Sequence, residues 1–316
     1  MLLPPTVAAP DTPDDDPRLG HWLAANRLDD RTRVALVGFP SDEGVRRNGG
    51  RVGAADGPAA LRGALYRMTP DARYGDDRDD AFTALLERTA DLGDVPVTGD
   101  VARDQEALGE VVSALLARGV VPLVLGGGHE TTFGHALGFV RHGKPFHLLN
   151  WDAHADVRPL LDGGLGHGRL GHSGSPFRQA LEHPSGLAAS YTLAGAVPGR
   201  VSAAHAAYVR THGELVWLDA LDEARIDALA AGIGPRTLVS FDLDLVEAGA
   251  MPAVSAPGAG GLPPRLWLRA AEACARSPHA ASFDVVELCP RHDEGGRGAA
   301  LAARTVWHLL AGLAQR

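Results

Sequence analysis

Three polar side chains recur at every second position directly after an apolar run of the sequence. Asp152, His154 and Asp156 follow residues 146–149, which are typical of a buried strand. If the backbone is extended where that strand ends, the three side chains project to one side. Buried carboxylates are costly unless they are paired or bind a metal. The stretch therefore favours a metal site, and helix capping by Asp156 is the ordinary alternative.

Two further stretches have the same setting. His129 follows three glycines after the apolar run 120–125, and Asp242 and Asp244 come at the end of the run 238–241. The glycines let the backbone bend tightly and approach a ligand, and neither phosphate-binding glycine pattern is present. On its own, His129 fits a buried core histidine as well as a ligand. An Asp-x-Asp pair at a strand end also occurs in magnesium-dependent enzymes. Together, the three stretches reinforce one another.

Six side chains are thus candidate metal ligands: His129, Asp152, His154, Asp156, Asp242 and Asp244. Such an oxygen-rich set favours Mn²⁺ over Zn²⁺, which prefers His and Cys in four-coordinate sites. Carboxylates can bridge two ions, and a pair of ions can turn water into a nucleophile at neutral pH. The reaction class is therefore metal-assisted hydrolysis. A serine mechanism is the rival class, but residues 171–175 do not match G-x-S-x-G.

The elements that must position these residues alternate along the chain. Apolar runs predict strands at 34–39, 89–92, 120–125, 146–151, 191–196, 214–218, 237–242 and 281–286. Amphipathic stretches predict helices near 57–66, 106–118, 131–141, 176–182, 201–211, 220–231, 264–276 and 298–314. This rhythm is typical of a mostly parallel sheet covered by helices on both faces, a three-layer α/β/α domain. Ligands bind such sheets at the carboxyl ends of the strands, where all three stretches fall.

Composition narrows the class of protein further. With 316 residues, of which 45% are hydrophobic, the chain can build one large domain, for which we expect residues 31–316. We expect the acidic, proline-rich residues 1–30 to form a loosely ordered arm. The net charge of -9 argues against nucleic acid or an anionic membrane surface as a partner.

Cysteine usage and apolar runs bear on the cellular setting. Cys274 and Cys289 are too few for a disulfide framework and indicate a reducing compartment. No apolar run approaches the length of a transmembrane helix, and the N-terminus has no convincing signal peptide. We therefore expect a cytoplasmic protein.

The three stretches resemble the signatures of the ureohydrolase family, which includes arginase, agmatinase and formimidoylglutamase. The resemblance rests on residues 126–130, 150–156 and 240–244, and the order and spacing agree from about residue 34 onward. It implies an arginase-like fold with an eight-stranded sheet, two Mn²⁺ ions per subunit, and hydrolysis of a C–N bond in an amidine or guanidine. It also implies a homo-oligomer, either a trimer or a hexamer.

The resemblance implies roles for single residues. One ion would be held by His129, Asp152, Asp156 and Asp242, and the other by Asp152, His154, Asp242 and Asp244. Asp152 and Asp242 would bridge the ions, and Asp156 would also orient the attacking water. Glu287, after the strand 281–286, matches the acidic residue that pairs with the cationic nitrogens of the substrate.

Within the family, the chain looks closest to formimidoylglutamase. Ala155 and Arg158 replace residues that are typical of arginase, and residues 42–48, 173–179 and 301–307 also look like formimidoylglutamase. The implied reaction, part of histidine degradation, splits N-formimidoyl-L-glutamate into L-glutamate and formamide. Another ureohydrolase (arginase, agmatinase or a guanidino-acid hydrolase) is the alternative. A catalytically silent metal-binding scaffold is the alternative from a different class, although all six ligand positions are filled.

The substrate of that reaction has two carboxylates, which arginines can bind with paired hydrogen bonds. Arg158 is the first candidate, and Arg51 and Arg178 follow, although surface salt bridges would explain the latter two equally well. Arginase has a proton-shuttling histidine in the loop after its metal motif. His172 is the nearest counterpart, and His167 is the alternative.

Overall fold

A single parallel sheet organises the chain. The computed structural model describes residues 2–13, 15–163 and 168–316. Its sheet has eight strands in the order β2-β1-β3-β10-β9-β4-β7-β8, and every neighbouring pair is parallel. The strands are β1 (Val34–Phe39), β2 (Thr89–Asp94), β3 (Val121–Gly126), β4 (Phe146–Trp151), β7 (Ala188–Ala196), β8 (Gly213–Trp217), β9 (Thr237–Asp242) and β10 (Ala280–Val286). A separate antiparallel pair is formed by β5 (Leu161–Asp162) and β6 (Arg169–Leu170).

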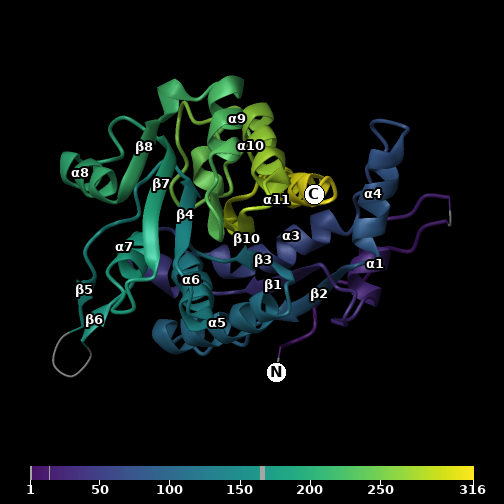
Figure 1. The fold of residues 1–316 in the computed structure, drawn as a ribbon, viewed down its shortest axis with the longest axis horizontal. Coiled ribbons are helices and arrows are strands. Elements are labelled where there is room, and N and C mark those ends of the chain that lie inside the picture. Colours follow the sequence, from purple (N-terminus) through teal and green to yellow (C-terminus); the bar gives the residue numbers. More distant parts are fainter. Residues whose placement is uncertain (1, 14, 164–167) are drawn as a thin grey trace.

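Helices cover both faces of the sheet, as the strand–helix rhythm predicts (Figure 1). On one face lie α3 (Gly57–Leu65), α9 (Glu223–Ala231), α10 (Pro264–Arg276) and α11 (Arg297–Leu313). On the other lie α5 (Val101–Ala117), α6 (Thr131–His142) and α7 (Pro176–Leu181), while α8 (Ala203–His212) packs on β7 and β8 at the sheet edge. Alternate residues of a strand enter different core clusters: Val34 and Leu36 join one, and Val37 and Phe39 join another. The expected three-layer fold is confirmed.

Helix boundaries differ from the prediction where a polar cap starts a helix early. α5 begins at Val101 rather than near residue 106, because the Asp100 side chain accepts a hydrogen bond from the Arg103 amide. α9 begins at Glu223 rather than residue 220, since Asp222 caps it in the same way. The apolar spacing alone did not mark either start.

Within the described ranges, three α-helices were not predicted: α1 (Leu19–Ala25), α2 (Glu43–Arg47) and α4 (Asp77–Leu86). In α4 only Phe82 and Leu86 are buried, so its apolar pattern is weak. Parts of the segment expected to be a loosely ordered arm contact the rest of the domain. Leu19 and Leu23 of α1 are fully buried, and Leu3 exchanges backbone hydrogen bonds with Asp94 of β2. The domain boundary at residue 30 stays a prediction.

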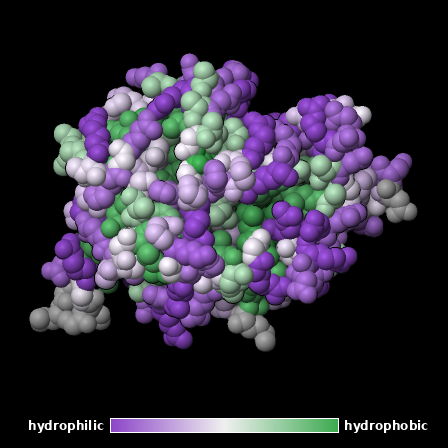
Figure 2. All heavy atoms as spheres, viewed as in Figure 1, coloured by the Kyte–Doolittle hydropathy of each residue, from purple (hydrophilic) through white to green (hydrophobic). Residues whose placement is uncertain are grey.

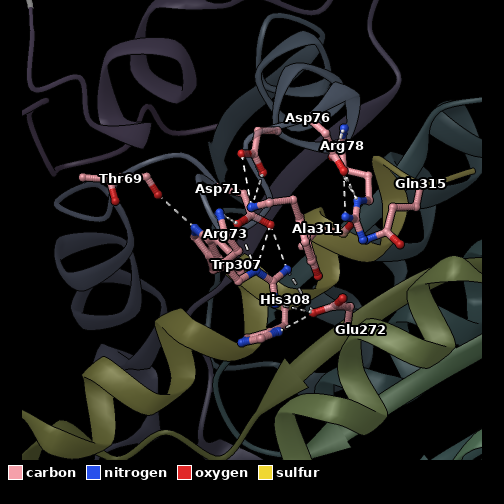
Figure 3. Close-up of polar contacts among 12 residues, drawn as sticks. Thr69, Asp71, Arg73, Asp76, Arg78, Glu272, Trp307, His308, Ala311 and Gln315 are labelled. Carbon is pink, nitrogen blue, oxygen red and sulfur yellow. Dashed lines mark hydrogen bonds and ion pairs between the residues drawn. The ribbon is translucent and has the colours of Figure 1, made fainter.

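Polar contacts tie the segment before α4 to α10 and α11 (Figure 3). Arg73 bonds both Asp71 and the Glu272 carboxylate, whose Oε2 also lies 2.7 Å from His308 Nδ1. The Trp307 indole donates to the Thr69 carbonyl at 2.9 Å. These bonds join segments that lie far apart in the sequence.

The face of the molecule drawn in Figure 2 is mostly polar. Hydrophilic side chains dominate the raised parts of the face in Figure 2, and hydrophobic ones show mainly in the hollows between them. Among the described residues, the exposed large hydrophobic side chains are Leu3, Tyr74, Val97 and Leu161. Within the described ranges, no helix is long and apolar enough to cross a membrane.

A buried ion cluster joins α3 to the edge strand β2. Arg62, with 1% of its side chain exposed, donates to Asp91 Oδ2 at 2.7 Å and to Asp94 Oδ1 at 2.6 Å. The Tyr66 hydroxyl adds a 3.0 Å bond to Asp91. Each member is paired, which is the condition for burying such charges.

We predict that Arg62→Ala lowers the free energy of unfolding by about 3–5 kcal/mol, because it leaves buried carboxylates without their partner. Urea unfolding of the purified protein measures this. The matched control is Arg78→Ala, whose pair with Asp76 is exposed and should contribute little. Equal shifts of the unfolding midpoint in both variants would contradict the prediction.

Candidate metal centre and active-site cavity

The candidate ligands lie along the carboxyl ends of neighbouring strands. In the sheet, β3, β10, β9 and β4 follow one another. His129 lies just beyond β3, Asp152 follows β4, and Asp242 is the last residue of β9. Glu287 follows β10 directly. Because parallel strands end at the same edge, these separate stretches meet there.

A first group of ligand atoms surrounds the His129 ring. His129 Nδ1 lies 2.9 Å from Asp156 Oδ2, 2.9 Å from Asp242 Oδ2 and 3.5 Å from Asp152 Oδ2. The ligand atoms of these four side chains lie within 4.8 Å of one another. They match the first predicted set.

A second group adjoins the first and shares Asp152 with it. His154 Nδ1 lies 3.1 Å from Asp244 Oδ2 and 3.5 Å from Asp152 Oδ1. The two oxygens of Asp152 therefore face different histidines, as a bridging ligand requires. Asp242 belongs to the first group but not to the second, so its bridging role stays a prediction.

Local turns, rather than a continued strand, aim these side chains. Asp152 Oδ1 accepts the His154 amide at 2.7 Å, and Asp242 Oδ1 accepts the Asp244 amide at 2.8 Å. Both are turns in which an Asp side chain bonds the backbone two residues on. β4 ends at Trp151, and Asp156 has a left-handed φ of 47°. The extended backbone that we expected for this stretch is thus wrong, although its three side chains do converge.

The charge balance of the site fits a divalent cation. Burial raises the pKa of Asp242, and the carboxylates of Asp244 and Asp152 raise it further. Burial opposes protonation of His154, yet Asp244 and Asp152 raise its pKa to about 12. His129 Nδ1 and Asp244 Oδ1 are buried without a hydrogen-bond partner among the described residues. A bound metal ion would satisfy these two unpaired ligand atoms, which lie among carboxylates.

Glu287 stands beside the centre in a strained conformation. Its φ of 70° is left-handed, and its amide donates to the Gly127 carbonyl at 2.8 Å. Oε1 accepts the His129 amide at 2.8 Å, whereas buried Oε2 has no hydrogen-bond partner among the described residues. Burial raises the pKa of Glu287 to about 7, with the nearby Asp244 carboxylate adding to it. One oxygen therefore anchors the side chain and the other is free for a ligand.

A cavity of about 210 Å³ opens onto these groups. Its acidic part contains Asp156, Asp242, Asp244 and Glu287, beside His154. Its remaining polar lining is Asn48, Arg158, Ser173, Arg200, His205 and Ser255. An acidic centre and guanidinium groups thus share one small space.

Of the predicted arginines, Arg158 lines the cavity and the other two do not. Arg158 Nη1 donates to Asn48 Oδ1 at 3.1 Å. Arg51 instead donates to the carbonyls of Val254 and Ser255. Arg178 pairs with Glu182 at 2.7 Å. Arg178 thus makes the surface salt bridge that we weighed as its alternative role, whereas Arg51 bonds backbone carbonyls instead. A part of either residue in substrate binding stays a prediction.

His172 is buried but faces the main chain. Its Nε2 lies 3.1 Å from the Pro159 carbonyl, and its Nδ1 accepts the Gly174 amide at 3.1 Å. Both ring nitrogens are thus engaged, and His172 does not line the cavity. This geometry lets His172 hold the loop, and its role in proton transfer stays a prediction. The alternative, His167, lies outside the described residues.

Two of the cavity residues that were not predicted carry titratable side chains, Arg200 and His205. Arg200 donates to the carbonyls of Ala256 and Pro257 at 3.0 and 2.9 Å, and His205 lies at the start of α8. Burial lowers the pKa of His205, and the positive charge of Arg158 lowers it further. Neither residue carries a local motif. The only available signal was their place after β7, the strand beside β4.

Comparison with known proteins gives the family. The model of the arginase family matches residues 32–312, and the chain belongs to that family. It is 37% identical over 290 residues to a formimidoylglutamase of Klebsiella pneumoniae, covering 87% of this chain and 84% of the relative. It is 36% identical over 289 residues to that of Salmonella typhi, covering 88% and 84%.

Solved structures agree on the fold. The structure of Trypanosoma cruzi formiminoglutamase with Mn²⁺ has a TM-score of 0.85 and 33% sequence identity, and the match covers 96% of this chain and 100% of that one. The expected arginase-like fold is confirmed at this level too.

A buried carboxyl beside the centre yields a pH prediction. Glu130 Oε1 accepts the Gly44 amide at 2.8 Å, and burial together with Glu287 raises the pKa of Glu130 from 4.5 to about 8. Between these pH values the folded carboxyl holds a proton that the unfolded one has lost, so folding stability falls as pH rises. We predict that Glu130→Gln flattens this decline in metal-free protein. Thermal unfolding of chelator-treated protein at pH 5 and pH 8 measures it.

Exposed Glu294 provides the matched control. Glu294→Gln should keep the wild-type difference between the two pH values. A Glu130→Gln variant with the same pH dependence as the wild type would refute the role given to the buried carboxyl.

Proposed function

We propose that the chain is a binuclear manganese hydrolase that cleaves N-formimidoyl-L-glutamate to L-glutamate and formamide, a step of histidine degradation. The observation that carries this proposal is the cavity in which the acidic centre and Glu287 share walls with Arg158 and Arg200. The relatives are named formimidoylglutamase, and the Trypanosoma cruzi structure holds Mn²⁺. The substrate, with one cationic head and two carboxylates, has the charges that this cavity complements.

The residues fit the metal as a set. His129, Asp152, Asp156 and Asp242 would hold one ion, and His154, Asp244 and the shared Asp152 would hold the other, with Asp242 as a second bridge. Four carboxylates and two imidazoles favour Mn²⁺ over Zn²⁺. When bound, the ions lower the pKa of water and so supply a nucleophile at neutral pH.

The chain's own side chains orient the substrate. The free Oε2 of Glu287 accepts hydrogen bonds from the amidinium-like head. Two arginines hold the carboxylates of the substrate. Arg158 is itself held by a hydrogen bond to Asn48, and Arg200 by hydrogen bonds to two backbone carbonyls. These contacts fix the formimidoyl carbon beside the acidic centre, which lowers the entropic part of the barrier.

The reaction then needs one addition and one proton transfer. Water adds to the formimidoyl carbon, and the bond from this carbon to the glutamate nitrogen breaks. Asp156 takes the proton lost by the water and gives it to the departing nitrogen. Formamide and glutamate leave, so no other reactant is consumed. His205, which lines the cavity, is better placed than His172 to take part in proton transfer.

Assembly and location complete the proposal. We expect a homo-oligomer, trimeric or hexameric, and a cytoplasmic location, in accord with the family. We expect neither a nucleic acid nor a membrane as a partner. Size measurement in solution tests the assembly.

Substrate turnover is the direct test. Manganese-loaded protein should release formamide and glutamate from N-formimidoyl-L-glutamate and leave arginine and agmatine untouched. Asp152→Ala should lose both manganese and turnover, because both ligand groups use this carboxylate. Exposed Asp219→Ala is its control. Urea released from arginine or agmatine, with N-formimidoyl-L-glutamate intact, would assign the chain to another ureohydrolase activity.

The arginine assignment has its own prediction. Arg158→Leu and Arg200→Leu should each raise KM about 10- to 100-fold, since a charge-assisted hydrogen bond contributes about 1.5–3 kcal/mol. Steady-state kinetics with manganese content measured in parallel separates this from metal loss. Arg118→Leu, at the end of α5, should leave KM unchanged. An unchanged KM in both cavity variants would remove the arginines from substrate binding.

A further inference from the structure

A chain of buried polar side chains leads away from the cavity, starting at His129. His129 Nε2, on the opposite side of the ring from the carboxylates, lies 3.0 Å from Ser240 Oγ. Ser240 Oγ donates to Asp284 Oδ1 at 2.5 Å. His129 is 1% exposed, and Ser240 and Asp284 are fully buried. None of the hydrogen bonds beyond His129 reaches the cavity.

The chain continues on the far side of Asp284. Asp284 Oδ2 accepts from Thr132 Oγ1 at 3.1 Å and lies 2.8 Å from His135 Nδ1. His135 Nε2 in turn lies 2.7 Å from Ser282 Oγ. The carboxylate is thus contacted by two hydroxyls and one imidazole, which satisfy a group that would be costly to bury alone.

Regular structure fixes the positions of these groups. Ser240 of β9 and Asp284 of β10 are paired residues of adjacent strands, so their side chains leave the same face of the sheet. Thr132 and His135 lie in α6, which packs on that face. Ser240 and Asp242 are two residues apart on β9, which joins the polar chain to a ligand position through rigid backbone.

The chemistry of the groups gives the hydrogen bonds a direction. A carboxylate only accepts, so Asp284 holds the Ser240 hydroxyl hydrogen toward itself. The Ser240 oxygen then presents a lone pair to His129, whose Nε2 must carry the ring hydrogen. In the neutral ring, His129 Nδ1 then carries no hydrogen, and its lone pair lies on the side of the three carboxylates. Of the two neutral tautomers, this one can bind a metal through Nδ1.

The second histidine of the centre has no such support. His154 has 25% of its side chain exposed, and no hydrogen bond to its Nε2 is made by any described residue. The two groups therefore share Asp152 but differ in how firmly their imidazole is held.

We propose that Ser240 and Asp284 are positioning residues that set the tautomer and orientation of His129, so that the ion on the His129 side is held more tightly than the ion on the His154 side. This inference rests on the proposed manganese function and adds to it an inequality between the two sites. It assigns a purpose to a buried carboxylate that touches neither substrate nor metal.

The test uses Asp284→Asn and Ser240→Ala in the full chain, with manganese binding as the readout. In Asp284→Asn an amide NH₂ can point at Ser240, which turns the serine hydrogen toward His129 and favours the wrong tautomer. Ser240→Ala removes the acceptor outright. In each, calorimetric titration of chelator-stripped protein should show the affinity of one site reduced about 10- to 100-fold, with the other site close to wild type.

Spectroscopy and a control separate positioning from general damage. Dialysed variants should hold one manganese ion per subunit, and electron paramagnetic resonance should show isolated Mn²⁺ where the wild type shows a spin-coupled pair. Ser282→Ala is the matched control, because Ser282 is equally buried and its hydroxyl, among the described residues, bonds only His135, at the end of the polar chain away from His129. It should retain two ions. Unfolding of the metal-free variants checks that each is folded, and Ser240→Ala, the smaller change, stands if Asp284→Asn does not fold.

Each outcome has a distinct meaning. Two ions bound at wild-type affinity in both variants would overturn the positioning role while leaving the proposed function intact. Equal losses in both variants and in Ser282→Ala would overturn it as well, because they would indicate a general packing effect. A wild-type chain that binds no manganese would overturn the proposed function, and this inference with it.

Discussion

The structure depends on one unfavourable interaction, the repulsion between four aspartate carboxylates that are gathered at one edge of the sheet. Asp152 is fully buried, and Asp242 and Asp244 are almost so. Burial raises the pKa of Asp242, and the neighbouring carboxylates raise it further. The carboxylates of Asp244 and Asp152 also raise the pKa of His154. Only a compensating positive charge makes such a cluster tolerable in a folded protein. The fold therefore holds these carboxylates in positions that suit a bound cation.

The backbone that carries this cluster adopts conformations that are themselves unfavourable. Asp156 and Glu287 both have left-handed φ angles, a conformation that disfavours side chains larger than glycine. At Gly127, a side chain would collide with the Ser41 carbonyl, so the turn before His129 admits only glycine. Strain of this kind persists where surrounding contacts over-determine the backbone, as they do between β3 and β10.

Opposite charges are kept apart within the cavity. The acidic groups sit at the strand ends, whereas Arg158 and Arg200 come from loops and are braced by neutral oxygens rather than by carboxylates. Guanidinium groups so braced keep hydrogen-bonding capacity for a ligand. A molecule with a cationic head and anionic ends would thus meet complementary charge at each end.

The sequence by itself determined the ligand types, the strands that carry them and the layered fold, because continuous apolar runs, amphipathic helical spacing and residue chemistry are local properties. The six candidate ligand positions could be predicted for this reason, whereas Glu287 was predicted from the resemblance to the family. Tertiary structure alone decided which arginines face the cavity: Arg200 is placed by carbonyls 56 residues away, while Arg51 and Arg178 turn to other partners. It also turned both nitrogens of His172 to the main chain and linked His129 to Asp284. Such outcomes depend on contacts between distant segments, which no local pattern encodes.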